Sequence, residues 1–261
     1  MDQFEAARIG DLEWFNNNKF DINAQDGCCF TALMCASQRG RKEIAFALIE
    51  KGANLDLQDY GGDTALNRAS YNGHKEIAFA IIEKGANLNL QNYYGKTALI
   101  CASWNNHKEI AFALIEKGAK LDLQTDNKDT ALICASYNGH KEIAFALIEK
   151  GANLDLQDNQ SNTALICASF QGHKEIVFKL MENGADTNIC NVMGDTAISD
   201  ALSGGHKEIA DAIESWQRTP ISLKYTIQMH LKRCGTDTSN MPNLLLQRNS
   251  IDKEINKHEP I

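Results

Sequence analysis

The feature that most constrains this chain is an internal repeat of 33 residues. A Thr-Ala-Leu or Thr-Ala-Ile step recurs with no slip in the interval, and it begins at Thr31, Thr64, Thr97, Thr130, Thr163 and Thr196. A fixed period of about 20–50 residues is typical of solenoids, in which each copy buries its apolar face only against its neighbours. We therefore expect the 261 residues to form a stack of similar units without one central core.

Each copy predicts two short helices followed by a turn. In one copy, residues 130–138 form a first helical segment, and residues 140–150 form a second one with Ile and Leu at helical spacing. Gly139 and Gly151 are expected to end these helices, because glycine adopts the left-handed conformation common at helix C-termini. Polar stretches such as 59–63 would then form the tips of hairpins between successive helix pairs.

Three motifs identify the type of repeat: the Thr-Ala-Leu step, a Gly-His pair before the second helix, and a Gly-Ala pair after it. Together they resemble the ankyrin repeat, whose usual Thr-Pro-Leu-His is replaced here by Thr-Ala-Leu-Ile or a variant of it. The lost proline is favoured at a first helical position but is not required there. The resemblance covers roughly residues 1–214 and implies an all-α repeat solenoid of stacked helix pairs with protruding β-hairpin turns.

The chain divides into three parts by its repeat pattern. Residues 1–25 are expected to be a degenerate capping repeat, with a second helix about three residues shorter than in the other copies. Residues 26–217 hold five nearly regular repeats and a sixth that decays, and residues 218–261 form a tail. Within that tail, Thr219 followed by proline predicts the start of a helix at 220–234 that caps the last repeat.

Charge and hydropathy exclude two classes of partner. The net charge is −8, which divides into −11 for residues 1–214 and +3 for the tail. An acidic body argues against nucleic acid as a partner, because nucleic-acid binding depends on clustered cations. No apolar run approaches the ~18 residues of a membrane span, and the first residues lack the basic and apolar regions of a secretory signal.

The eight cysteines read as free thiols. Cys35, Cys101, Cys134 and Cys167 occupy one repeat position, where stacked helices would hold them about 8–10 Å apart. A disulfide needs Cα atoms within ~7 Å, and zinc–sulfur bonds are ~2.3 Å long, so we expect small buried helix residues. Unpaired thiols in this number indicate a reducing compartment, cytoplasmic or otherwise intracellular, delivery into a host cell included.

No catalytic constellation stands out from the repeat. Five histidines share one position, at the start of the second helix, where we expect local hydrogen bonds: His74, His107, His140, His173 and His206. A regular spacing of about 10 Å between copies cannot bring two of them together as a catalytic pair. The sequence also lacks a Ser-His-Asp arrangement, a phosphate-binding glycine loop and a metal-ligand cluster. We therefore predict a protein that is not an enzyme and needs no cofactor or metal.

One position near the end of the first helix varies while its neighbours are copied. In successive copies it is Gln38, Tyr71, Trp104, Tyr137, Phe170 and Ser203. By the resemblance to ankyrin repeats, this position faces the concave groove, so its four aromatic residues would form a row. Aromatic side chains dominate binding hot spots, which favours a peptide-binding row. The alternative is that the rings only shield the hairpins against the helix ends.

The hairpin tips carry tyrosine and aspartate. The candidates there are Tyr60, Tyr93, Tyr94 and Asp126, with Asp59, Asp63, Asp129 and Asp158 nearby. Cation–π contacts and ion pairs at these tips would suit an extended partner segment that carries Lys or Arg. Arg68 interrupts the row of copied cysteines and is expected to pair with an acid such as Asp63. Solvated charge is the alternative interpretation of such tips.

The sequence therefore predicts a monomeric, non-catalytic scaffold that binds a protein or peptide partner through its concave groove and hairpin tips. The alternative is an adaptor that recruits a partner to a ubiquitin ligase. Residues 220–225 and 231–233 resemble the start of a SOCS box, although Ile227 and Gln228 stand where Cys-Arg is usual. Deleting the tail would separate the two functions, because only the adaptor needs it.

Overall fold

The computed structural model describes residues 1–219, which contain fourteen α-helices joined by turns and no β-strand. These residues belong to two compact units, the first formed by 1–135 with 142–153 and the second by 136–141 with 154 onward. The predicted all-α repeat solenoid is confirmed. The predicted helix at 220–234 and the rest of the tail lie outside the described residues.

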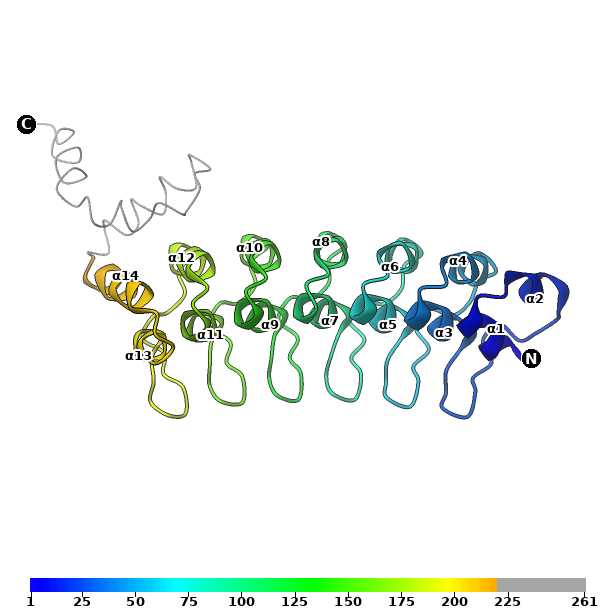
Figure 1. Cartoon of the computed structure of the whole chain (residues 1–261), viewed down its shortest axis with the longest axis horizontal. Coiled ribbons are helices and arrows are strands. Elements are labelled where there is room, and N and C mark those ends of the chain that lie inside the picture. Colours follow the sequence, from blue (N-terminus) through cyan, green and yellow to red (C-terminus); the bar gives the residue numbers. More distant parts are fainter. Residues whose placement is uncertain (220–261) are drawn as a thin grey trace, which may run out of the picture. The chain divides into compact units, whose positions relative to one another are not determined.

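The helices come in pairs, one pair for each copy of the repeat. The pairs are α1 Gln3–Ile9 and α2 Leu12–Asn17, α3 Ala32–Arg39 and α4 Lys42–Glu50, α5 Ala65–Asn72 and α6 Lys75–Glu83, α7 Ala98–Trp104 and α8 Lys108–Glu116, α9 Ala131–Asn138 and α10 Lys141–Glu149, α11 Ala164–Gln171 and α12 Lys174–Glu182, and α13 Ala197–Ser203 and α14 Lys207–Arg218. Within each unit, long loops extend from the first helices on the side away from the second helices (Figure 1).

The copied Thr and Gly residues set the helix ends. In α7 the hydroxyl of Thr97 accepts the N–H of Ile100 at 3.2 Å, which satisfies one of the open donors at the N-terminus. In α5 the chain leaves the helix through Gly73 at φ +76°. A Cβ on Gly73 would lie 2.4 Å from the His107 ring, so this position needs both the left-handed backbone and the missing side chain.

The copied histidines join neighbouring repeats. The Nε2–H of His107 donates to the carbonyl of Tyr71 at 3.1 Å, across 36 residues of sequence. His74 makes the equivalent bond to the carbonyl of Gln38 at 3.3 Å. The expectation of local bonding by these histidines is therefore wrong. Each of the two rings lies on the Gly of the preceding copy and reaches the end of its first helix, because that Gly leaves room for the ring.

The core is the apolar strip that the repeat copies. In α7, Leu99 is 1% exposed and Cys101 is 4% exposed, and in α8 Leu114 is fully buried. The four copied cysteines are buried and form no disulfide, as predicted. Burial of a leucine side chain contributes about 1.5–3 kcal/mol, so this recurring strip supplies much of the stability of each helix pair.

A ladder of glutamines ties the base of each hairpin to the next in the first unit. The Gln58 amide donates to the carbonyl of Gly62 in its own hairpin at 2.6 Å and to the carbonyl of Gln91 in the next copy at 3.0 Å. Gln25 and Gln91 repeat this pattern. The hairpins are thus fixed at their bases, and their tips are held at regular intervals.

The two terminal repeats differ from the regular copies. At the N-terminus α2 has six residues, against nine in α4, and the capping role of this repeat stays a prediction. At the other end α14 has twelve residues, and it buries Trp216. The helix runs to Arg218, one residue past the predicted boundary at 217, which stays a prediction because the chain from 220 onward is not described.

Candidate interaction groove

A pocket of about 420 Å³ opens in the first unit, where helix ends face hairpin tips. Four of the residues predicted from the sequence line it: Tyr71, Tyr94, Trp104 and Asp126. They come from three successive copies, with Tyr71 and Trp104 on helices and the other two on hairpins. We call this pocket and its rim the groove pocket.

The helices present Tyr71 and Trp104 at their last turns. Tyr71 is 53% exposed and precedes the end of α5 by one residue, while Trp104 is the last residue of α7 and is 46% exposed. The hydrogen bond from His107 fixes the backbone carbonyl of Tyr71. Both exposed rings line the same pocket, and contiguous apolar surface with a polar rim is typical of interaction sites. The backbone beneath Tyr71 is also anchored.

The hairpins bring Tyr94 and Asp126 next to each other. The N–H of Asp126 donates to the carbonyl of Tyr94 at 3.0 Å, although the two residues belong to different copies. The N–H of Tyr94 is itself held by the side-chain oxygen of Asn92 at 3.0 Å. An aromatic ring and a carboxylate therefore share the tip side of the groove pocket, and Tyr94 is 67% exposed.

Buried residues Ile100, Cys101 and Cys134 form the floor. Burial raises the pKa of the Cys101 thiol to about 12, and burial also raises the pKa of Cys134. Both thiols are therefore protonated at neutral pH and unsuited to nucleophilic attack or metal binding. Residues 1–219 contain no group of three or more His, Cys, Asp or Glu side chains placed to hold a metal ion.

The rim of the groove pocket carries charges of both signs. Its aspartates were predicted from the sequence, but its lysine was not. Lys96 and Asp129 line the groove pocket together with Asp126. Lys96 stands directly before the copied Thr-Ala step, where three other copies have Asp63, Asp129 and Asp195. That departure from the repeat was the sequence signal that could have identified Lys96.

The other predicted residues lie elsewhere. Tyr60 and Tyr93 are 66% and 72% exposed on hairpin tips of the first unit, but they do not line the groove pocket. Tyr137 and Phe170 lie in the second unit and are 45% and 46% exposed. Their role in binding stays a prediction.

Two of the aspartates expected to select a basic partner serve the hairpin instead. Asp59 is 3% exposed, and its Oδ1 accepts the N–H groups of Gly61 at 2.7 Å and Asp63 at 3.0 Å. Its Oδ2 pairs with the guanidinium of Arg68, which also lies 3.3 Å from Asp63 and over the ring of Phe30 at 4.6 Å. The predicted pairing of Arg68 with an acid is confirmed, and it leaves Asp59 closed to a partner.

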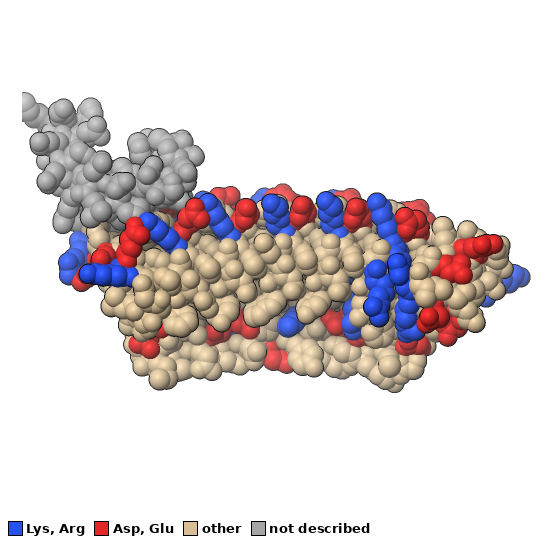
Figure 2. Space-filling model, viewed as in Figure 1, with Lys and Arg blue, Asp and Glu red and all other residues tan. Residues whose placement is uncertain are grey.

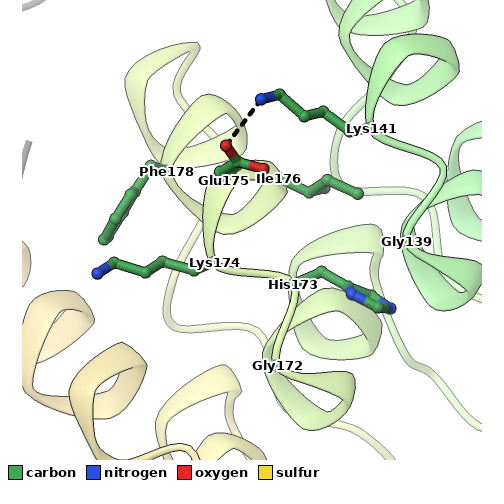
Figure 3. A pocket seen from close by; sticks show the side chains of 8 residues that line it. All are labelled: Gly139, Lys141, Gly172, His173, Lys174, Glu175, Ile176 and Phe178. Atoms are coloured by element: carbon green, nitrogen blue, oxygen red, sulfur yellow. Dashed lines mark hydrogen bonds and ion pairs between the residues drawn. The ribbon is translucent and has the colours of Figure 1, made fainter. Parts of the chain in front are cut away.

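A second pocket, of about 430 Å³, lies in the second unit (Figure 3). Lys141 reaches across it and donates to Glu175 at 2.7 Å. The ring of His173 lies against Gly139 and donates to the carbonyl of Tyr137 at 3.1 Å. The same glycine–histidine contact recurs between copies in the first unit, so this pocket is part of the regular packing between repeats. It contains none of the predicted binding residues.

Comparison with known proteins agrees with this fold. A family model described as ankyrin repeats in three copies matches residues 4–92, 117–191 and 153–215, and one described as ankyrin repeats in many copies matches residues 78–115. The crystal structure of the human ASB11 ankyrin repeat domain aligns with a TM-score of 0.72 at 22% sequence identity, covering 84% of this chain and 99% of that one.

The search of curated proteins found no match. Among the helices of residues 1–219, none combines the length and the apolar composition needed to cross a bilayer.

Proposed function

Because the chain belongs to the ankyrin-repeat family, we propose that it is a non-catalytic protein-interaction module whose groove pocket grips an extended partner segment carrying Lys or Arg. Ankyrin repeats generally serve as protein-binding modules. The cysteines of the described residues form no disulfide, which supports a role in a reducing, intracellular compartment. We also propose that the chain acts as a monomer.

The observation that carries this proposal is the convergence of four varied residues on one pocket. Tyr71, Trp104, Tyr94 and Asp126 stand at positions that change between copies, and together they line the groove pocket. Ring faces carry negative potential, so a cation between them gains about 0.5–2 kcal/mol in addition to the apolar area it buries. The neighbouring carboxylates supply charge-assisted hydrogen bonds.

Lys96 on the same rim sharpens the expected partner. Its ammonium would repel a cation placed close to it, so we expect the partner's basic side chain to lie on the Asp126 side of the pocket. The partner segment then needs a neutral or acidic residue on the Lys96 side. This charge pattern would fix the orientation in which the partner segment binds.

The test begins with capture of partners from cell lysate by the full chain, followed by mapping of the bound segment as a peptide. Tyr71→Ala combined with Trp104→Ala is expected to lower the affinity for that peptide by at least about a hundredfold, because both residues would be anchors. Tyr137→Ala combined with Phe170→Ala is the matched control from the second unit. Both pairs remove exposed rings, so circular dichroism should show unchanged helix content.

Replacing the basic residue of the peptide by norleucine should also lower the affinity of the peptide for the full chain. If the folded Tyr71→Ala/Trp104→Ala variant keeps full affinity, the groove pocket is not the binding site. If only the second-unit control loses affinity, the site lies around Tyr137 and Phe170. Binding that survives the norleucine exchange unchanged would refute the basic-partner proposal while leaving the pocket in place.

The adaptor alternative concerns residues 219–250, which lie almost entirely outside the described residues. A chain that ends at Gln217 tests it directly. If partner capture by this shortened chain equals that of the full chain, but a ligase subunit is lost from the captured material, the tail is a recruiting segment. If nothing is lost, the tail has no part in binding.

A further inference from the structure

The turn between α3 and α4 has a charge pattern that no other copy shares. It reads Arg39-Gly40-Arg41-Lys42, whereas the equivalent turns of the later copies place Asn, Gln or Gly before a Gly or Asn, and then His-Lys. All three cationic residues are exposed. We call Arg39, Arg41 and Lys42 the basic corner.

Arg41 performs the packing role of the missing histidine with one nitrogen only. Its Nε donates to the carbonyl of Arg8 at 3.0 Å, as the ring of His107 donates to the carbonyl of Tyr71. Within residues 1–219, the two terminal nitrogens of Arg41 make no hydrogen bond or ion pair, and the guanidinium of Arg39 has no such partner either. Histidine would have sufficed for the contact between repeats, so the arginine adds donors that the fold does not use.

Neighbouring acids offset only part of this charge. Lys42 lies 3.8 Å from Glu76, a longer separation than in the other lysine–glutamate pairs between second helices. Asp11 follows Gly10, over which the Arg41 side chain lies, and its Oδ1 accepts the N–H of Trp14 at 2.9 Å at the start of α2. Glu43, the second residue of α4, is an exposed acid next to Lys42 in the sequence. Figure 2 shows Lys and Arg side chains gathered over the α3–α4 end of the first unit.

We propose that the basic corner is a docking surface for a segment of a partner protein rich in Asp and Glu. Each guanidinium offers two parallel N–H donors that match a carboxylate, and exposed ends of this kind form the stronger class of ion pairs. The body of the chain is acidic, but its repulsion falls off within a Debye length of about 8 Å at physiological salt. The interaction is therefore local, and it is independent of the groove pocket.

Other polyanions fit the corner less well. Nucleic-acid binding gains most of its affinity from about 6–10 phosphate contacts, and three cations on a chain of net charge −8 cannot supply them. Anionic membranes are typically bound by clusters of about 4–8 Lys or Arg residues. A short acidic peptide needs only the two arginines and the lysine that are present.

The test measures binding of a fluorescein-labelled oligoglutamate peptide to the full chain by fluorescence anisotropy, at low and at physiological salt. Arg39→Asn combined with Arg41→His installs the residues of the next copy and should weaken binding about tenfold or more. Lys84→Gln combined with Lys117→Gln removes two positive charges elsewhere in the same unit and should change affinity less than about twofold.

A second variant, which adds arginines at another turn, keeps the test valid if the Arg39→Asn/Arg41→His variant fails to fold. Asn72→Arg combined with His74→Arg builds a second basic corner one repeat further on, and it should increase the affinity for oligoglutamate. Equal binding by the wild type and the Arg39→Asn/Arg41→His variant would overturn the proposal, as would an equal loss in the lysine control. Tighter binding of single-stranded DNA or of phosphatidylserine vesicles than of the peptide would overturn the assignment of an acidic protein segment.

Discussion

The inner face of the first helices and one exposed position in their last turn follow opposite rules. In α7, Ala98 and Leu99 are at most 1% exposed and recur in the other regular copies, while Trp104 is 46% exposed and its position varies. The inner face must fit the neighbouring helix pair, so every copy needs the same shape. The exposed position held by Trp104 meets no such demand, and its side chain can vary toward a partner without loss of stacking.

Two residues depart from this division and show its limits. Arg68 stands at a position copied as cysteine, yet it pairs with Asp59 instead of packing as a small apolar residue. Glu182 is a copied residue in altered surroundings, since it is 6% exposed whereas the equivalent Glu83 is paired with Lys117 at the surface. Position in the repeat therefore predicts packing only where the neighbouring copy is also regular.

The largest expected effect comes from the inner face. Leu99→Ala should lower the free energy of unfolding by about 2.7–5 kcal/mol, because it leaves a cavity in a fully packed strip. Trp104→Ala, five residues later on the same helix, should lower the free energy of unfolding by less than about 1 kcal/mol, although it should weaken partner binding. Urea denaturation measures both values. If the two substitutions cost the same, the contrast between the inner face and the exposed position of the last turn is wrong.

Arg68 should give the next largest effect. Arg68→Cys restores the copied residue but leaves Asp59 buried without its cation, and we expect a loss of about 2–4 kcal/mol. Adding Asp59→Asn should recover most of that loss, because Asn92 holds the equivalent turn of the next copy through the same backbone bonds. The coupling comes from a double-mutant cycle in urea. If the two losses simply add, the Arg68–Asp59 pair does not stabilise the hairpin.

Glu182 should give a smaller, pH-dependent effect. Burial raises the pKa of Glu182 to about 7, although the charge of Lys179 acts in the opposite direction, and its Oε1 has no hydrogen-bond partner among the described residues. The folded state therefore binds this proton more tightly than the unfolded chain, whose reference value is 4.5. Its contribution to stability is greatest below pH 4.5 and declines as the pH rises towards about 7.

Glu182→Gln removes this titration. The variant should be more stable than the wild type by about 1–3 kcal/mol at pH 8, where the wild type must bury a charge, and close to it at pH 5. Urea midpoints of both proteins across this pH range provide the measurement. A difference that does not change with pH would show that Glu182 titrates normally.

The smallest effect is expected where the copied glutamate remains at the surface. Glu83→Gln breaks the pair with Lys117 at 2.9 Å, in which the two side chains are 65% and 50% exposed. Exposed pairs of this kind contribute less than about 1 kcal/mol and are screened by salt. The urea midpoint should therefore move only slightly, and less at high salt. A loss as large as the change in Glu182→Gln would remove the distinction between the two glutamates.

Much of the fold could be predicted from the period alone. The threonine, the Gly-His pair and the Gly-Ala pair locate both helices of each copy, because these residues act through local backbone geometry. Half of the candidate site residues also lie together in one pocket, since positions that vary against a copied background are free of the stacking constraint. Tyr71 and Trp104 are the examples, 33 residues apart in sequence.

The remainder depends on contacts that one copy cannot reveal. The sequence suggests local hydrogen bonds for the copied histidines, but the carbonyl that His107 bonds lies 36 residues earlier in the chain. Asp59 was counted as a partner-binding acid because its burial follows from the position of Arg68 in space. The burial of Glu182 could not be foreseen from the sequence either, although Trp216 stands where regular copies place the pairing lysine, as Lys117 does for Glu83.

The ladder of glutamine bonds has a consequence for how the chain folds. Gln58 reaches Gln91 across 33 residues, and the Asn87 N–H reaches Asp56 across 31. In the first unit, bonds between copies thus close loops of nearly equal length, and their entropic cost is the same at every junction. Folding can begin at any adjacent pair and spread outward, without waiting for distant segments to meet.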